Sequence, residues 1–203
     1  MLTITIYYII VVVLHPMNLE AFKYTANYCE ENIWHLCQHP LVEGYSNKVL
    51  IISNSTKNCP FYCQKTSQEN QPVWWDYHVV LMTTKDGVHH IYDFDSTLAF
   101  PSLMCEYLNF TFPNSDIWLS KDLPFFKVIS SEVYIKTFNS DRNHMKDASG
   151  SWIFEPPNWP PIQGGNSLLQ DLMNFTENSQ EQLISLDEMQ LHSNNLQSFF
   201  CNI

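Results

Sequence analysis

The sequence predicts an α+β fold, and three observations support this prediction. Apolar residues recur at helical spacing between residues 29 and 37, two β-forming stretches flank a short turn between residues 73 and 96, and proline-rich loops follow. A helix that precedes antiparallel strands is typical of α+β domains. With 203 residues, 45% of them hydrophobic, the chain can bury one sizeable core. We therefore expect a single domain over residues 1–203.

The first helix is expected in "NYCEENIWHLC", residues 27–37. Its apolar positions, which repeat at the spacing of one helical face, are Ile33, Trp34, Leu36 and Cys37. Asn27 is expected to cap the helix, with Glu30 and Glu31 in its first turn. Cys29 then lies at the N-terminus of a helix.

The next expected elements are short, apolar strands. "NKVLIISN" (47–54) predicts a buried strand that ends in polar residues. "VWWDYHVVLM" (73–82) and "VHHIYDFDS" (88–96) predict two strands that pair through the turn "TTKDG" (83–87). This hairpin is the clearest in the sequence.

The second half of the chain alternates short elements with loops. "FFKVISSEVYIKTF" (125–138) predicts a strand and then a short helix, whereas residues 141–152 and 155–165 are expected to be loops, because prolines in the second forbid regular structure. The tail, residues 179–200, has helical spacing in part and also has room for one last strand.

An apolar run, "LTITIYYIIVVVL", occupies residues 2–14. No basic residue precedes it, no small-residue cleavage site follows it, and it is short for a membrane span. Its β-branched and aromatic residues leave three interpretations open: an edge strand, a buried extension or a misassigned start of translation. We treat residues 1–20 as an atypical apolar extension and expect no association with a membrane.

The net charge of −11 excludes the basic surface that nucleic-acid binding requires. Six cysteines in a chain of this length lack the density of a disulfide-stapled domain, so we expect them to be mostly reduced. Cys59 and Cys63 have no second Cys or His pair at a matching spacing. We therefore expect no metal and no cofactor.

Cys29 has three interpretations: a core residue, one half of a disulfide, or a nucleophile. A helix N-terminus stabilises a thiolate and can lower the pKa of a cysteine. Glu30 and Glu31 oppose this effect unless their side chains point into solvent. A nucleophilic Cys29 would therefore need a basic partner.

His78 is the strongest candidate for that partner, because an unused imidazole would be costly in so apolar a strand. The alternative is a hydrogen-bonded core histidine. A third group must orient the imidazole, and the hairpin offers Asp93 and Asp95. If Asp86-Gly87 forms a two-residue turn, His78 faces Asp95 and lies diagonal to Asp93; a three-residue loop would turn both carboxylates away.

Other polar residues have weaker claims. His89 and His90 are expected to be a solvated pair near the turn, whereas His144 could line a cleft. Asp141 and Arg142 are expected to form an ion pair that shapes their loop.

Several motifs in this order resemble those of the protein N-terminal glutamine amidohydrolase family, over roughly residues 27–175. The motifs are "YCEENIWHLC" (28–37), "ISN" (52–54), "VWWDYHVVL" (73–81), "IYDFDS" (91–96), "FNSDRNHMKDASGSW" (138–152) and "EPPNWPPI" (155–162). Each motif alone is weakly specific, but together they are specific. The tail, residues 177–203, diverges from the family pattern.

The resemblance implies a catalytic triad of Cys29, His78 and Asp93. It also implies a papain- or transglutaminase-like core, in which an N-terminal helix bearing the cysteine packs on a mainly antiparallel sheet bearing the histidine and aspartate, with helices on both sides. The implied protein is a metal-free monomer of cytosol and nucleus.

The implied reaction is deamidation of N-terminal glutamine to glutamate with release of ammonia, in the N-degron (N-end rule) pathway. Its partners would be proteins or peptides with a free N-terminal glutamine. A carboxylate or carbonyl would best bind their α-ammonium group. The candidate substrate-binding residues are Glu30, Asp76, Asp95, Asp141 and His144. Strand alternation is expected to send Trp75 and Tyr77 to the face opposite His78.

Three rival functions stay open. The first is another thiol enzyme on the same framework, either a peptidase or a glutamine transferase. The second is a secreted binding protein without activity, in which the apolar run is a signal and the cysteines are oxidised. The third is an inactive member of the family.

Overall fold

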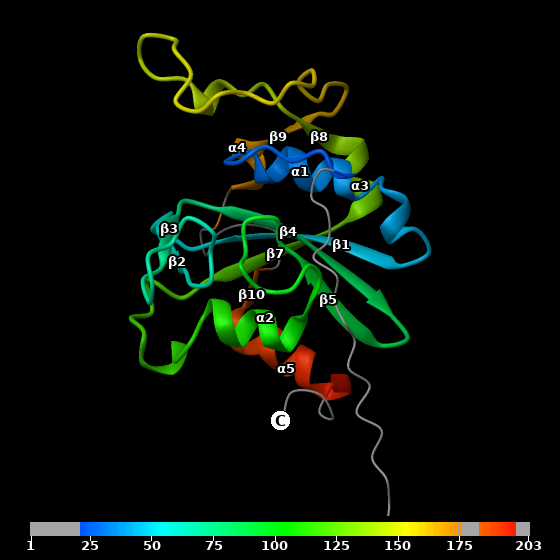
Figure 1. Cartoon of the computed structure of the whole chain (residues 1–203), viewed down its shortest axis with the longest axis vertical. Helices are drawn as coiled ribbons and strands as arrows, with labels where there is room; N and C mark the ends of the chain where they lie inside the picture. Colours follow the sequence, from blue (N-terminus) through cyan, green and yellow to red (C-terminus); the bar gives the residue numbers. More distant parts are fainter. Residues whose placement is uncertain (1–20, 174, 176–182, 198–203) are drawn as a thin grey trace, which may run out of the picture.

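A six-stranded antiparallel sheet forms the centre of the molecule (Figure 1). The computed structural model describes residues 21–173, 175 and 183–197. The strands run in the spatial order β10-β7-β1-β4-β5-β6. Their bounds are β1 Ser46–Ser53, β4 His78–Lys85, β5 Val88–Tyr92, β6 Ser102–Leu103, β7 Phe125–Ser130 and β10 Leu183–Ser185.

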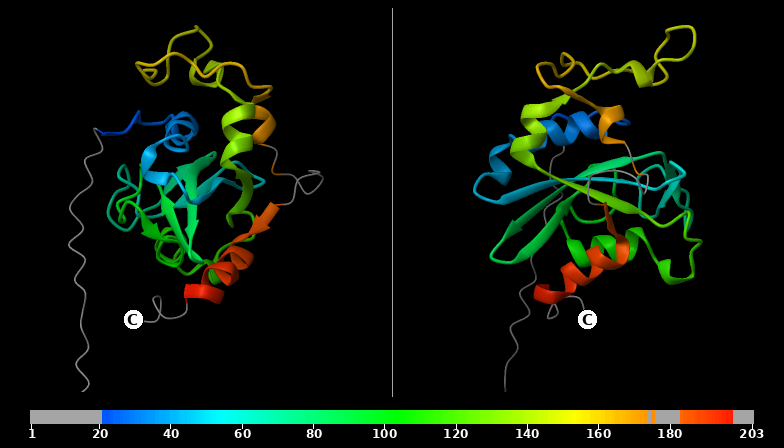
Figure 2. Two further views of the ribbon diagram at one scale, coloured as in Figure 1. Left: turned by 90° about the vertical axis from the view of Figure 1, so that its right-hand side faces the viewer. Right: turned by 180° about the vertical axis from the view of Figure 1, so that it is seen from behind.

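Helices cover both faces of this sheet (Figures 1 and 2). On one face lie α1 (Cys29–Leu36), α3 (Ser131–Thr137) and α4 (Leu169–Leu172), and on the other lie α2 (Met104–Thr111) and α5 (Leu186–Gln197). Each face has its own buried hydrophobic cluster, one around Ile33, Val49 and Val79 and the other around Leu50, Val80 and Tyr107. The α+β class and the antiparallel sheet are confirmed.

Shorter elements complete the chain. Two small sheets pair β2 (Cys59–Phe61) with β3 (Val73–Trp75), and β8 (Phe138–Asn139) with β9 (Ser167–Leu168). Single 3₁₀ turns occupy Pro40–Val42, Ser115–Ile117 and Asn143–Met145. Most of residues 140–166 form a long loop above α1 and α3 (Figure 2).

The hairpin between β4 and β5 has the register of a two-residue turn. Lys85 pairs with Val88 and Leu81 pairs with Tyr92, so Asp86 and Gly87 alone form the loop. Both turn residues have positive φ, 51° and 80°, as a type I′ turn requires. Of the two loop lengths that the sequence left open, the structure has the two-residue turn, which directs His78 toward the segment that follows β5.

The prediction of one strand over residues 73–82 is wrong, because the structure divides this segment into two strands. Residues 73–75 leave the main sheet and pair with β2, and β4 begins only at His78. The interruption has a local cause, because Asp76 accepts the backbone N–H of Tyr77 with its own side chain, and its carbonyl accepts the Ser53 hydroxyl. Similarly, β5 ends at Tyr92 and not at residue 96.

Asn27 does not cap α1, which is a second correction. Its backbone is left-handed, with φ of 67°, and the N-cap position belongs to Tyr28 without a side-chain cap. The side chain of Asn32 instead bonds both the N–H and the carbonyl of Thr25. This pair of bonds fixes the chain where it enters the helix.

The tail contains both elements that its pattern allowed. β10 adds an edge strand to the sheet beside β7, and α5 packs against α2. The apolar extension at residues 1–20 lies outside the described residues, as do residues 177–182 and 198–203 of the tail. Within the described ranges, no helix is both long enough and apolar enough to cross a bilayer.

Candidate active site

Cys29 is the first residue of α1, and the helix packs against β4. Its side chain is 7% exposed. The backbone N–H of Val79, the residue after His78, hydrogen-bonds the sulfur of Cys29. The fold therefore brings the cysteine of the helix to the start of the strand that carries the histidine.

The thiol of Cys29 is kept protonated in the free protein. Burial raises its pKa well above the usual value, and the neighbouring Glu30 carboxylate raises it further. The helix N-terminus does not offset these two effects, so a nucleophilic Cys29 requires the basic partner that the sequence predicts. The thiol can lose its proton only when a base accepts it during the reaction.

His78 and Asp93 form a buried pair. The Nε2 atom of His78 lies 2.8 Å from Oδ1 of Asp93, and both side chains are 1% exposed. Burial alone would lower the pKa of His78, but the charge of Asp93 and their hydrogen bond raise it. Conversely, the pKa of Asp93 is lowered by His78 against the effect of burial. The second imidazole nitrogen, Nδ1, is buried without a hydrogen-bond partner among the described residues.

Asp93 is held by three further donors. Its Oδ1 accepts the backbone N–H of Asp95, and its Oδ2 accepts the Tyr107 hydroxyl at 2.9 Å and the Gln64 amide at 3.2 Å. Gln64 and Tyr107 are not among the residues that the sequence predicted for the site. Neither residue carries a sequence signal for this role, because each comes from a distant segment that only the fold brings to Asp93.

The His78 ring lies between two aromatic side chains. Trp75 stacks on it with ring centroids 5.3 Å apart and an interplanar angle of 16°, and Phe61 meets it edge-on at 5.4 Å. Trp75 was expected on the opposite face of the sheet. The expectation is wrong because the strand is interrupted at Asp76, which resets the alternation.

Asp95 lies close to the pair but bonds elsewhere. Its Oδ1 accepts the Tyr24 hydroxyl at 2.6 Å, and burial raises its pKa. The structure thus places Asp93, and not Asp95, on the imidazole.

Glu31 points inward and binds Arg142 in a buried, two-bond ion pair. Arg142 Nε lies 2.7 Å from Oε1 and Nη2 lies 2.8 Å from Oε2. The Ser140 hydroxyl and the Trp159 indole also donate to this carboxylate. The expected Asp141–Arg142 pair is therefore wrong: Arg142 pairs with Glu31, and Asp141 accepts bonds from Asn143.

Glu30 is also buried, with 0% of its surface exposed. Its Oε2 accepts the Tyr77 hydroxyl at 3.1 Å and lies 3.6 Å from the Cys29 sulfur. Burial raises its pKa to about 7. Both glutamates of the first turn thus face the interior, where their charges act on the site.

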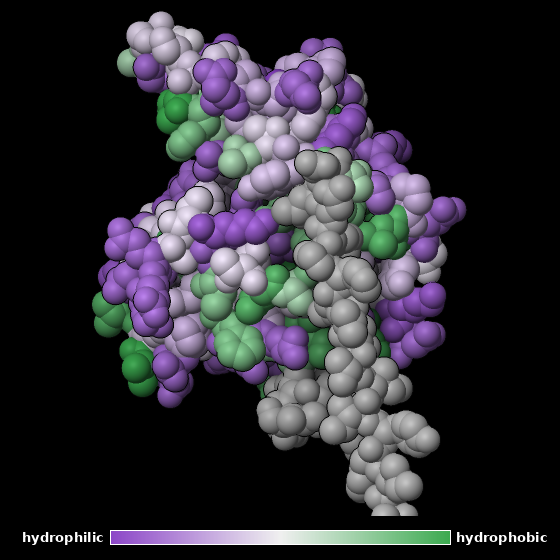
Figure 3. Space-filling view, viewed as in Figure 1, coloured by the Kyte–Doolittle hydropathy of each residue, from purple (hydrophilic) through white to green (hydrophobic). Residues whose placement is uncertain are grey.

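A pocket of about 190 Å³ opens onto Cys29. Its walls include Trp75, Asp76, Tyr77, His144, Met145 and Phe154. The volume is below the 300–1,000 Å³ of drug-sized sites, so it suits a single side chain and not an extended ligand. The loop that supplies three of these residues also exposes Trp152 and Ile153, and Figure 3 shows hydrophobic atoms on the side of this top loop that faces the body.

Among the described residues, one group of His and Asp side chains has its ligand atoms close enough together to hold a metal ion. It comprises His78, Asp93 and Asp95, whose atoms lie within 4.8 Å of one another. Hydrogen bonds already engage Asp93 at both oxygens and Asp95 at Oδ1. This arrangement fits an imidazole–carboxylate network better than a set of metal ligands.

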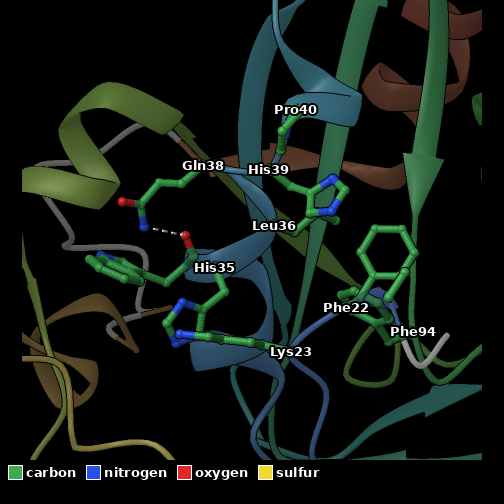
Figure 4. A pocket seen from close by; sticks show the side chains of 10 residues that line it. Phe22, Lys23, His35, Leu36, Gln38, His39, Pro40 and Phe94 are labelled. Carbon is green, nitrogen blue, oxygen red and sulfur yellow. Dashed lines mark hydrogen bonds between the residues drawn. The ribbon is translucent and has the colours of Figure 1, made fainter.

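A larger pocket, of about 440 Å³, lies beside the C-terminal half of α1 (Figure 4). Phe22, Lys23, His35, His39 and Phe94 line it. None of the residues predicted for catalysis or for substrate binding contributes to its walls.

The two histidines predicted near the turn do not line the pocket over Cys29. His89 and His90 are half-buried on β5, so they are not the solvated pair that was expected. Cys29, Cys37, Cys59 and Cys63 are free thiols, whereas Cys105 forms a disulfide.

A cysteine at the N-terminus of a helix that packs against the strand bearing a buried histidine–carboxylate pair is an arrangement that thiol hydrolases use. The model of the N-terminal glutamine amidase family matches residues 24–200 of the chain. The chain is 42% identical to the human protein N-terminal glutamine amidohydrolase over 156 residues, covering 73% of this chain and 75% of the human one. It is 35% identical to the Arabidopsis thaliana protein of the same name, over 84% of this chain and 82% of the relative. The chain therefore belongs to the N-terminal glutamine amidase family.

Proposed function

We propose that this protein hydrolyses the side-chain amide of an N-terminal glutamine, giving N-terminal glutamate and ammonia, with Cys29, His78 and Asp93 as the catalytic residues. The observation that carries the assignment of residues is the buried His78–Asp93 bond at the start of β4, beside the backbone N–H that contacts the Cys29 sulfur. Family membership supports the reaction.

The first half of the reaction releases ammonia. The Cys29 thiol gives its proton to Nδ1 of His78, the imidazole nitrogen that has no hydrogen-bond partner among the described residues, and the sulfur attacks the amide carbon of the substrate. The backbone N–H of Cys29 stabilises the resulting oxyanion. The C–N bond then breaks, the proton on His78 passes to the departing nitrogen, and a γ-glutamyl thioester on Cys29 results.

The second half consumes one water molecule. His78, now neutral, accepts a proton from water as the water oxygen attacks the thioester carbon. The C–S bond breaks, Cys29 recovers its proton, and glutamate leaves. Asp93 holds the imidazole in one orientation throughout and stabilises its cation.

We also propose a fold class, an oligomeric state and a cellular location for the enzyme. We place the sheet and α1 in the papain- or transglutaminase-like class, because the cysteine begins a helix, the histidine begins β4 and the aspartate directly follows the neighbouring strand β5. We further propose a monomer without metal or cofactor that acts in cytosol and nucleus, in the N-degron pathway.

The test is incubation with peptides that begin with glutamine, asparagine or pyroglutamate, or that carry glutamine only internally, with and without an added amine, while ammonia is monitored. We expect release from the glutamine peptide alone. Release from internal glutamine would instead indicate a broader amidase, cleavage of the peptide chain a peptidase, and incorporation of an added amine a transferase. No reaction with any peptide would indicate an inactive member of the family or a binding protein.

A further inference from the structure

Glu30 is a buried carboxylate with one oxygen left unsatisfied. Its Oε2 accepts from Tyr77 and contacts the Cys29 thiol, but Oε1 has no hydrogen-bond partner among the described residues. Buried charges in proteins are normally paired or fully hydrogen-bonded, because desolvation is otherwise costly. The orphaned oxygen therefore requires an explanation.

The adjacent glutamate provides the contrast. Glu31 is equally buried, yet Arg142 neutralises it and two further side chains donate to it. The cation-forming group nearest to Glu30 in the described part of the chain is His144, whose Nε2 lies 3.7 Å from Oε1. Burial lowers the pKa of His144, which disfavours its charged form. Glu30 thus lacks the cation that Glu31 has.

A small cavity lies beside Glu30. It measures about 10 Å³, which is room for one water-sized group. Its polar walls are Glu30, Asn139, Ser140, Asp141 and His144, so hydrogen-bond acceptors are abundant there. His144 also lines the pocket over Cys29, so the cavity and the pocket lie on either side of one residue, and we call the cavity the side chamber.

We propose that Glu30 binds the α-ammonium group of the substrate in this side chamber. The proposal rests on the proposed function, since it concerns the same glutamine. In an N-terminal glutamine, four covalent bonds separate the α-nitrogen from the amide carbon, a span of about 5 Å. The Cys29 sulfur, which attacks that carbon, lies 3.6 Å from Glu30 Oε2. One substrate residue can therefore reach both groups.

The other acidic candidates are less suited to this role. Asp95 accepts the Tyr24 hydroxyl and lines neither the pocket nor the side chamber. Both oxygens of Asp141 accept from Asn143. Asp76 lines the pocket but is exposed, so water would weaken its attraction for a cation.

Selectivity for a free N-terminus follows from the burial of Glu30. An ammonium group gives Oε1 a charged donor, whereas an acetylated or internal residue would leave the carboxylate buried and unpaired. The site would therefore reject glutamines that lack a free amino group even though the amide itself could still reach Cys29.

The experiment compares two peptides that differ only in the α-amino group. One begins with glutamine, and the other begins with 4-carbamoylbutanoyl, the same residue without the amino group. We expect the wild-type kcat/KM to favour the glutamine peptide by on the order of 100-fold, and Glu30→Gln to reduce this preference to a few fold. Glu106→Gln, the same change on an exposed residue of α2, is expected to keep it.

Each contrary result has its own meaning. If the wild-type protein releases ammonia but does not discriminate, or if Glu30→Gln discriminates as well as wild type, the assignment of Glu30 is wrong while the proposed function stands. If Asp76→Asn loses the preference for the glutamine peptide and Glu30→Gln keeps it, Asp76 and not Glu30 binds the α-ammonium group. If the wild-type protein releases no ammonia from either peptide, the proposed function itself fails.

A binding measurement covers the case in which Glu30→Gln does not fold. The groups around Glu30 that can affect its ionisation are Cys29, Glu31, Tyr77, Tyr134, Asp141 and His144.

Calorimetry on the Cys29→Ala protein at pH 7, in buffers of different ionisation enthalpy, would count the protons that are released when a peptide binds. We expect release of a fraction of a proton with the glutamine peptide and none with its analogue; equal release with both peptides would overturn the proposal.

Discussion

Glu31 and Arg142, 111 residues apart in the sequence, join α1 to the loop that covers it through two hydrogen bonds of 2.7 and 2.8 Å. The same loop carries His144, Met145 and Phe154 to the Cys29 pocket. The ion pair therefore fixes one wall of the pocket to the helix that begins at the proposed nucleophile.

Arg142→Ala is predicted to destabilise the protein strongly, because it leaves the Glu31 carboxylate buried without its cation. The expected loss is about 3–5 kcal/mol in the free energy of unfolding, or on the order of 10 °C in Tm for a chain of this size. Thermal unfolding would measure it. Lys121→Ala, at an ion pair whose lysine is 58% exposed, is the control and should change Tm little. A Tm for Arg142→Ala equal to that of wild type would show that the pair does not hold the loop.

Asp93→Asn is predicted to lower kcat by on the order of 10⁴-fold, by analogy with the loss of the orienting carboxylate in a serine protease triad. The amide can still fill the space and accept bonds, so the fold should persist. Asp95→Asn is the matched control, since Asp95 bonds Tyr24 and not His78. Steady-state kinetics on a glutamine peptide would compare kcat for the two variants. A larger loss for Asp95→Asn would mean that Asp95 orients the imidazole.

Glu30→Gln is predicted to stabilise the protein more at high pH than at low pH. In the folded state, burial raises the pKa of Glu30 from 4.5 to about 7. The folded state therefore binds this proton more tightly than the unfolded state does, and ionisation costs stability. The cost is absent below pH 4.5, grows between pH 4.5 and 7, and is constant above pH 7. The glutamine side chain of the variant does not ionise, so the variant does not lose this stability as the pH rises.

The measurement is denaturant unfolding of wild type and Glu30→Gln at pH 4.5 and pH 8. Relative to wild type, the variant should gain on the order of 3 kcal/mol between these two pH values. Glu43→Gln, at an exposed position, should show no such difference. A pH-independent effect of Glu30→Gln would contradict the burial of an ionisable Glu30.

Local sequence patterns predicted the parts of the fold that depend on neighbouring residues. The helical spacing after Cys29 predicted α1, and the turn around Asp86-Gly87 predicted the hairpin, although the sequence left its register open. The choice between Asp93 and Asp95 could not be made from that register, because β5 ends at Tyr92 and the carboxylates follow it in irregular backbone. Only the resemblance to a family indicated Asp93.

Contacts between distant segments could not be predicted. Arg142, the partner of Glu31, lies more than a hundred residues away in the sequence. The residues "CEEN" alone therefore could not predict that both glutamates are buried. Gln64 and Tyr107 reach Asp93 from a loop and a helix on separate segments. Trp75 was predicted on the wrong face of the sheet, because the hydrogen bond from the Tyr77 N–H to the Asp76 side chain interrupts the alternation of the strand.

The most direct test of the account is the rate of ammonia release from a glutamine peptide by Cys29→Ala. We predict a fall of on the order of 10⁴-fold or more with little change in Tm. Cys37→Ala, the same substitution at the other end of α1, should retain most of the activity. Ammonia release by a folded Cys29→Ala protein at the wild-type rate would contradict the account, because no other residue in it attacks the amide.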